Sequence, residues 1–245
     1  MNHFPRLSTL QTIATSVVVL ALLVLPVQAT NLVANGSFEN IGTNTASFSI
    51  SKDGVLPNWA ATPSGNKILD CLIVAGATMN LCGTTAFGGG FTFWENPGPS
   101  PDGGNFVGMD GYNAYSTPLT QTITGLLPGA SYAISFYQAA GQQRGFDGAT
   151  TERWQVQFGS ASQLSVLMSN ANHGHVNWMS QTLTFTASAA SQVLSFIAIG
   201  TPNGLPPFVL LDGVSINQVP EPATRGLIVL GMLAIPVAAR FRRKS

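Results

Sequence analysis

The sequence predicts an all-β fold, a jelly-roll β-sandwich of two packed antiparallel sheets. Between Thr30 and Val219, many short runs rich in β-branched and aromatic residues are separated by Gly, Pro, Asn and Ser, and few segments show a helical period. Several of these runs alternate apolar and polar residues, as half-buried strands do because successive side chains point to opposite faces. No internal repeat of fixed period is present, which disfavours a propeller or a solenoid. Ten or so strands with short turns are typical of a jelly roll.

The expected strands follow one another along the chain with turn residues between them. LPGA at 127–130 predicts one such turn, because Pro fixes φ and Gly takes a conformation that other residues avoid. The candidate strands are 31–34, 67–74, 104–109, 118–124, 131–140, 153–158, 162–168, 176–187, 191–200 and 207–217.

Two of these strands show which side chains should face the core. In SYAISFYQ, Tyr132, Ile134 and Phe136 share one face. In FVLLDGVSI the same period puts Asp212 on the inward face, together with Phe208, Leu210, Val214 and Ile216.

The N-terminus has the layout of a secretory signal peptide. A basic start at 1–6 and an apolar core at 12–25 precede VQA at 27–29, so we expect cleavage after Ala29. An N-terminal membrane anchor is disfavoured, because about 20 apolar residues are needed to span the hydrocarbon and Pro26 ends this run early. Residues 30–218 then form one domain.

The exported part of the chain is acidic, although the whole chain is neutral. Residues 30–219 hold nine acidic residues against four basic ones, a net charge of −5. Most nucleic-acid affinity comes from clustered Lys and Arg that release counterions from phosphates, so nucleic acid is not an expected partner.

The two cysteines of the chain, Cys71 and Cys82, both lie in the exported part. Thiols pair in oxidising compartments, which predicts a disulfide between them. Zinc would need three or four ligands at suitable spacing, and the sequence offers no other Cys or nearby His.

The segment 84–104 interrupts the succession of strands with six glycines and three prolines. A loop of this length inside a compact domain is often functional or mobile. Its aromatic residues, Phe87, Phe91, Phe93 and Trp94, favour a packed or binding loop over a disordered one.

Three short motifs resemble the galactose-binding-like jelly rolls that include many carbohydrate-binding modules. They are NLVANGSFE at 31–39, LPNW at 56–59 and LLDGVSI at 210–216, where the first and last would be the first and last strands. In such relatives the opening Glu and the closing Asp often lie together at a structural calcium site, which here implies Glu39 and Asp212. The alternatives are that Gly213 forms a bulge that turns Asp212 to solvent, or that a backbone amide satisfies its carboxylate.

The C-terminus resembles the PEP-CTERM sorting signal of exported bacterial proteins. VPEP at 219–222, with Pro220, Glu221 and Pro222, precedes an apolar segment at 226–239 and a basic tail at 240–244. The resemblance implies processing by an exosortase and delivery to the surface or the extracellular matrix of a Gram-negative bacterium. Arg225 and Pro236 depart from the usual pattern.

The length of the tail agrees with a temporary anchor. A helix over 226–239 would rise about 21 Å, which is short of the ~30 Å hydrocarbon layer. The terminal basic cluster would stay cytoplasmic by the positive-inside rule, which leaves the domain outside the inner membrane.

Aromatic side chains are the candidates for stacking on sugar rings. Trp59 and Trp154 are assigned to the core, whereas Trp94, Tyr112 and Tyr115 are the candidate exposed platforms. Asp110 and Asn113, in the same DGYNAYS stretch as the two tyrosines, could hydrogen-bond sugar hydroxyls.

No catalytic motif identifies an enzyme. His173 and His175 lack a third metal ligand at a telling distance and are interpreted as part of a polar turn. No GxSxG elbow is present. Asp102 and Asp110 could be the paired carboxylates of a glycosidase, but any acidic β protein supplies two.

The sequence therefore predicts a non-catalytic, exported protein that binds carbohydrate or exopolysaccharide in an extracellular matrix such as that of a biofilm. The alternative is a structural matrix or surface protein acting through protein contacts, and a secreted hydrolase is the third hypothesis.

Overall fold

The computed structural model describes residues 30–50, 56–61, 70–74, 92–95, 97–112, 114 and 117–220. This part of the chain is all-β and contains no helix. The strands are β1 (Ala60–Ala61), β2 (Asp70–Ile73), β3 (Phe106–Asp110), β4 (Leu119–Thr124), β5 (Ser131–Gln142), β6 (Thr150–Phe158), β7 (Ala161–Leu164), β8 (Met168–Asn170), β9 (His175–Thr186), β10 (Ser191–Thr201) and β11 (Pro207–Gln218).

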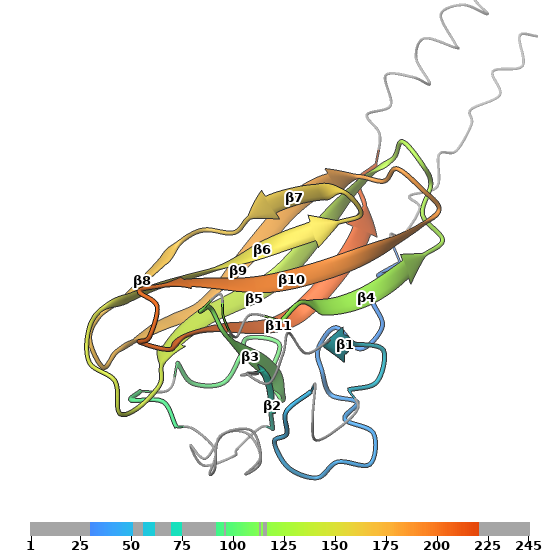
Figure 1. Ribbon diagram of the computed structural model, residues 1–245. Coiled ribbons are helices and arrows are strands. Elements are labelled where there is room, and N and C mark those ends of the chain that lie inside the picture. The colour runs from blue at the N-terminus through green and yellow to red at the C-terminus, as the bar shows by residue number, and fades with distance from the viewer. Residues whose placement is uncertain are drawn as a thin grey trace, which may run out of the picture.

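The strands form two antiparallel sheets that pack face to face (Figure 1). We name each sheet after its central strand. The β10 sheet has the order β1-β4-β10-β6-β7, with β8 also paired to β6, and the β11 sheet has the order β2-β3-β11-β5-β9. From β3 onward the chain alternates between the sheets, except that β6, β7 and β8 follow one another in the β10 sheet. Strands β3-β11-β5-β9 thus face β4-β10-β6-β7, which is the double Greek key of a jelly roll. The predicted fold class is confirmed.

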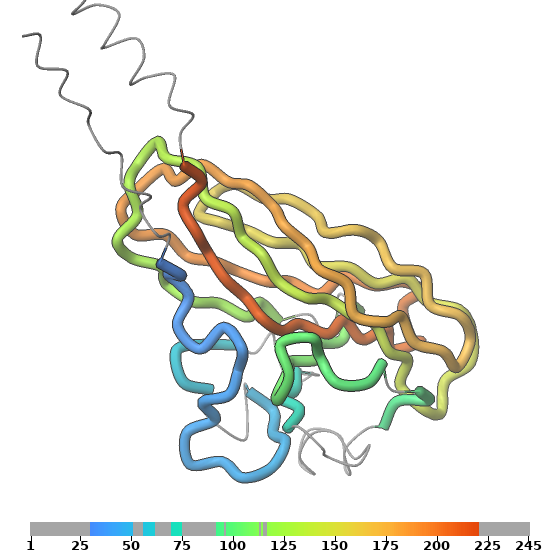
Figure 2. The backbone as a smooth tube through the Cα atoms, turned by 180° about the vertical axis from the view of Figure 1, so that it is seen from behind, coloured from blue at the N-terminus to red at the C-terminus, as the bar shows by residue number. Residues whose placement is uncertain are grey.

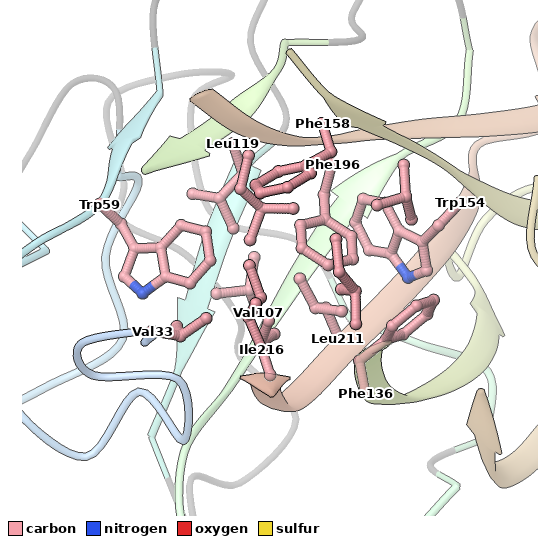
Figure 3. Packing of buried hydrophobic residues seen from close by; sticks show 14 of the residues in the cluster. Val33, Trp59, Val107, Leu119, Phe136, Trp154, Phe158, Phe196, Leu211 and Ile216 are labelled. Atoms are coloured by element: carbon pink, nitrogen blue, oxygen red, sulfur yellow. The ribbon is translucent and has the colours of Figure 1, made fainter. Parts of the chain in front are cut away.

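The main core lies between the sheets (Figure 3). Every second residue of β6 is buried, which brings Trp154, Val156 and Phe158 inward. Phe196 of β10 contacts the rings of Trp59, Phe136 and Trp154, with centroids 5.2 to 6.4 Å apart. The assignment of Trp59 and Trp154 to the core is confirmed, as is the shared inward face of Tyr132, Ile134 and Phe136.

The predicted face of β11 is wrong in its first half. Val209 and Leu211 face the main core, whereas Phe208 and Leu210 belong to a second cluster on the outer face of the β11 sheet. The register shifts between Asp212 and Ser215, and Gly213 has φ +59°. This bulge restores the inward direction of Val214 and Ile216, because one extra residue reverses the alternation.

Two expected strands also differ from the structure. Residues 31–34 are not a strand, although Leu32 donates to the carbonyl of Ile216 at 3.0 Å. The expected strand 162–168 is divided into β7 and β8, because the Ser165 side chain turns inward and bonds Trp154 N and Gln138 Oε1. The LPGA turn is confirmed, with Gly129 at φ +85°.

Segments from two distant parts of the chain flank β11. Figure 2 shows residues 30–50 in blue and 97–112 in green beside β11. Val214 N donates to Gly36 O at 2.9 Å, and Asn105 N donates to Glu39 Oε1 at 2.7 Å. Phe93 lies over Gly141, where a Cβ would meet its ring at 3.2 Å.

The two ends of the chain fall outside the described residues. The predicted signal peptide (1–29) and residues 221–245 of the predicted sorting signal, which include Glu221 and Pro222, are among the residues that are not described. Within the described ranges, no helix has the length and apolar character needed to cross a membrane.

Candidate functional site

One end of the β11 sheet brings together aromatic and charged side chains from three strands, β3, β11 and β9. In register, Asp110 of β3 pairs with Phe208 of β11, Phe208 pairs with Gly141 of β5, and Gly141 pairs with His175 of β9. Directly paired residues project to the same face of a sheet. Because Gly141 has no side chain, Phe93 fills its place and contacts Phe208 with ring centroids 5.4 Å apart.

Trp94 is partly exposed at this end, and its position is fixed on several sides. Its backbone N–H donates to Gln142 O at 3.0 Å, and its indole Nε1 donates to Phe146 O at 2.9 Å. The ring stacks on His173 with centroids 3.9 Å apart and an interplanar angle of 30°. The Arg144 guanidinium carbon lies 5.4 Å from the ring centroid, a cation–π distance.

The two histidines connect separate loops around Trp94. His173 Nε2 lies 2.6 Å from Asp147 Oδ1, and His175 Nδ1 lies 2.9 Å from Glu95 Oε2. His173 has φ +62°, and its backbone N–H donates to the buried Gln142 side chain at 2.7 Å. The β8–β9 turn is thus tied to both the Trp94 segment and the β5–β6 loop.

Tyr112 lies at the same end of the sheet. The preceding residue, Gly111, donates to Pro207 O at 2.8 Å, and Tyr112 N donates to Asp110 Oδ1 at 2.8 Å. Asp110 itself is fully buried, and no described residue hydrogen-bonds its Oδ2. Burial raises the pKa of Asp110 to about 7, and the Tyr112 amide only partly offsets this. Asp110 therefore holds the Tyr112 backbone rather than facing solvent.

Trp94, Tyr112 and Asp110 are thus gathered at one end of the sandwich. The other two predicted ligand-binding residues, Asn113 and Tyr115, lie outside the described residues. Five further residues belong to this surface and were not predicted: Glu95, Arg144, Asp147, His173 and His175. Only the NHGH pattern of the two histidines signalled them in the sequence, since their acidic partners are 26 and 80 residues away.

The structure separates the two carboxylates that were considered for a glycosidase. Asp110 pairs with Phe208 at one end of β11, whereas Asp102 packs beside Gly213, where a Cβ would lie 3.3 Å from Asp102 Cβ. Five residues of strand separate these positions, roughly 16 Å, and a glycosidase pair needs about 5 to 10 Å. These two residues do not form such a pair.

The predicted calcium ligands, Glu39 and Asp212, lie close enough for the charge of Glu39 to affect the pKa of Asp212. Asp212 is fully buried and its Oδ1 accepts from Gly213 N at 2.7 Å. Apart from the nearby Ser100 hydroxyl, its Oδ2 has no hydrogen-bond partner within the described ranges. Burial raises the pKa of Asp212 to about 7, the Ser100 hydroxyl and the Gly213 amide lower it, and the charges of Asp102 and Glu39 raise it further.

The bulge at Gly213 therefore does not turn Asp212 to solvent. The orphaned Asp212 oxygen and the nearby charges fit a cation, which would remove the desolvation cost. However, no three His, Cys, Asp or Glu side chains among the described residues are arranged to hold a metal ion. Calcium here would need backbone and hydroxyl oxygens in addition to the two carboxylates.

Of the two cysteines in the predicted disulfide, the structure describes only Cys71. Cys71 of β2 is fully buried in the second cluster and has no free thiol. Cys82 lies outside the described residues, so its pairing with Cys71 stays a prediction.

A cavity of about 500 Å³ lies at the same end of the sandwich, on the side of the β10 sheet. Strands β6, β8 and β10 contribute its polar lining, in which Thr151 Oγ1 lies 2.7 Å from Thr201 Oγ1. The lining includes Thr150, Thr151, Ser169, Asn170, Thr201 and Pro202. Gly148 N donates to Asn172 Oδ1, which connects the two loops between this cavity and the Trp94 surface.

No protein-family model and no curated protein sequence matches the chain. Solved structures match at low similarity. TmCBM61 in complex with beta-1,4-galactotriose is 12% identical with a TM-score of 0.43, and the match covers 78% of this chain and 99% of that one. The K2 cleaved adhesin domain of Lys-gingipain is 15% identical with a TM-score of 0.39, covering 79% and 99%. A CBM4 structure is 16% identical with a TM-score of 0.31, covering 76% and 99%. Similarities this low carry no inference about a ligand.

Proposed function

We propose that this chain is an exported, non-catalytic β-sandwich that binds carbohydrate through the surface around Trp94. The observation that carries the proposal is the fixed position of a partly exposed indole among polar groups. Stacking on His173 and the bond from Nε1 to Phe146 O hold Trp94 in one orientation. A rigid aromatic side chain loses little conformational entropy when a ligand binds, so its contact area contributes efficiently to affinity.

The groups around Trp94 supply hydrogen bonds of both kinds. Arg144 is a donor, and the carboxylates of Glu95 and Asp147 are acceptors at the surface. Sugar rings present apolar C–H faces and a rim of hydroxyls, which suits an aromatic ring surrounded by donors and acceptors. The net charge of −5 over residues 30–219 favours a neutral polysaccharide over an acidic one.

The cellular setting of the proposal rests on the two ends of the sequence. The signal peptide at 1–29 would direct export, and the VPEP motif with its apolar segment and basic tail would direct processing by an exosortase after transient insertion in the inner membrane. Delivery to the cell surface or the extracellular matrix follows from that signal. A structural calcium ion at Glu39 and Asp212 is part of the same proposal.

Binding of the purified chain to immobilised neutral and acidic polysaccharides tests the proposal. We expect retention on a neutral glycan and at least a tenfold loss of affinity in Trp94→Ala, since stacked aromatic residues are frequent hot spots. Leu127→Ala is the control, because Leu127 is exposed at the opposite end of β5. No retention on any glycan would refute the proposal. Self-association without glycan binding would favour a structural matrix protein, and hydrolysis of a glycan would favour an enzyme.

A further inference from the structure

Three polar side chains from β6 and β8 gather inside the sandwich, behind the cavity. Thr150 of β6 is the direct partner of Asn170 of β8, so their side chains lie on the same face. Glu152 is two residues along β6 and shares that face, which is the inward one. The exposed fractions of the three residues are 2%, 2% and 0%.

The polar atoms of this group are only partly satisfied. Thr150 Oγ1 donates to Glu152 Oε1. Apart from the contact between the Asn170 side chain and Glu152, neither Glu152 Oε2 nor the Asn170 amide has a hydrogen-bond partner among the described residues. A buried polar atom without a partner costs about 1 to 3 kcal/mol, and a buried carboxylate costs more.

No protein cation neutralises Glu152 in the described part of the chain. The ion pairs found there are those of His173 and His175, at the other sheet. Arg153 is adjacent in sequence, but its side chain projects to the opposite face because β6 alternates. Burial raises the pKa of Glu152 to about 8, and the Thr150 and Asn170 side chains lower it only in part.

We propose that Glu152, Thr150 and Asn170 form a binding site for a divalent cation, calcium in the extracellular setting, that is reached through the cavity. The three side chains offer carboxylate, hydroxyl and amide oxygens, the hard donors that calcium takes. Thr150 and Asn170 also line the cavity, which leaves space for the waters and carbonyl oxygens that complete six to eight ligands.

The charge of the site sets its affinity and its selectivity. A single carboxylate predicts a dissociation constant on the order of 10⁻⁴ to 10⁻³ M, as in extracellular calcium modules. Magnesium demands near-ideal octahedral geometry and releases its water reluctantly, so donors fixed on two rigid strands suit calcium better. This site is distinct from that of Glu39 and Asp212, because Asp212 belongs to β11 in the other sheet and Glu39 accepts from Asn105 N beside β3.

Terbium, which replaces calcium and luminesces when a nearby indole absorbs light, gives a direct measurement on the full chain. Trp154 is two residues from Glu152 on the same face of β6, about 7 Å along the strand. We expect sensitised emission that calcium competes away, and a calcium-dependent rise in the melting temperature that a chelator reverses. Both signals should also appear in Asp212→Asn.

Variants of the site decide the outcome. Glu152→Gln should weaken terbium and calcium binding by about tenfold or more. If that variant does not fold, Thr150→Val removes one oxygen at constant shape and should weaken binding in the same direction. Loss of the signal in Asp212→Asn but not in Glu152→Gln or Thr150→Val would overturn the proposal, as would the absence of any calcium-dependent emission or stabilisation. Glycan binding is also measured for Glu152→Gln. Unchanged glycan affinity in this variant would separate the result for the cation site from the proposed function.

Discussion

The two hydrophobic clusters of this protein differ in what covers them: the main core is covered by a second sheet, and the other cluster is covered by loop residues. The main core lies between two sheets and is mostly apolar, with Phe196 in contact with three other aromatic rings. Buried polar side chains such as Thr150, Glu152 and Asn170 are the exceptions. The second cluster lies on the outer face of the β11 sheet and is covered by loop residues such as Phe93. It is bordered by two fully buried carboxylates, Asp110 and Asp212.

This difference separates the part of the β11 sheet that stabilises the fold from the part that is proposed to bind a ligand. The inner face of β11 packs against another sheet, so every residue there is fixed by the fold. The outer face is closed by segments without regular ladders, and the partly exposed Trp94 and the histidine pairs lie at its edge. Segments with few ladder bonds open more readily than sheet strands and can adjust to a ligand.

The largest effect is expected from the main core. Phe196→Ala removes a fully buried ring that contacts Trp59, Phe136 and Trp154, and should lower the free energy of unfolding by about 3 to 5 kcal/mol. Urea unfolding followed by tryptophan fluorescence measures this loss. A change below about 1 kcal/mol would contradict the assignment of Phe196 to the centre of the core.

A comparable deletion in the second cluster should act locally. Phe93→Ala removes a ring that is 1% exposed, and we expect a loss of about 3 kcal/mol or less, because only a loop segment needs to open. Amide hydrogen exchange should accelerate in residues 97–112, whereas β6 and β10 keep their protection. Uniform acceleration throughout both sheets would show that the two regions unfold as one unit.

The buried carboxyl group of Asp110 makes stability depend on pH. Its pKa is about 7 in the folded protein against an ordinary value of 3.8, so between these pH values the folded state holds a proton that the unfolded state has lost. The contribution of Asp110 to stability should therefore fall as the pH rises from about 4 to about 7, by on the order of 4 kcal/mol.

Asp110→Asn removes this titration and should reduce the pH dependence of the free energy of unfolding, measured at pH 5 and pH 8. Part of the dependence should remain, because burial also raises the pKa of Asp212 to about 7 and that of Glu152 to about 8. Asp147→Asn is the matched control, because its carboxylate is 79% exposed. An equal pH dependence in Asp110→Asn and in the unsubstituted chain would contradict the buried position of Asp110.

The same comparison explains which features the sequence could predict. Alternation identified the inward residues of β5, where one face meets the main core and the other is partly exposed. It failed for β11, which is buried on both faces before Gly213, so that Phe208 and Val209 are equally apolar. A bulge at Gly213 was one of the alternatives taken from the sequence and is present in the structure, but its effect on Asp212 was not predictable, because Asp212 stays buried.

The residues of the candidate site could be predicted only where the residue type itself indicated a binding role. An aromatic residue in a Gly/Pro loop drew attention to Trp94, but its partners Arg144 and His173 are brought to it by the register of β5 and β9. Glu152 gave no signal, because RWQVQF predicts a strand from Arg153 onward and the strand begins three residues earlier, at Thr150. Because the alternation of β6 continues through these three residues, the Glu152 side chain faces the interior.

The smallest effect should come from the stacked pair at the edge of the second cluster. His173→Ala removes the ring beneath Trp94 and should cost about 1 kcal/mol of stability, the usual contribution of an aromatic pair. If Trp94 binds the glycan as proposed, the relative loss of glycan affinity should exceed the relative loss of stability. The indole ring would still be present, but it would no longer be held in one orientation by His173. His175→Ala is the control, since His175 contacts Glu95 and Asn177 and not the indole ring. Equal losses of affinity in the two variants would mean that loop anchoring, rather than the stacked support of Trp94, determines binding.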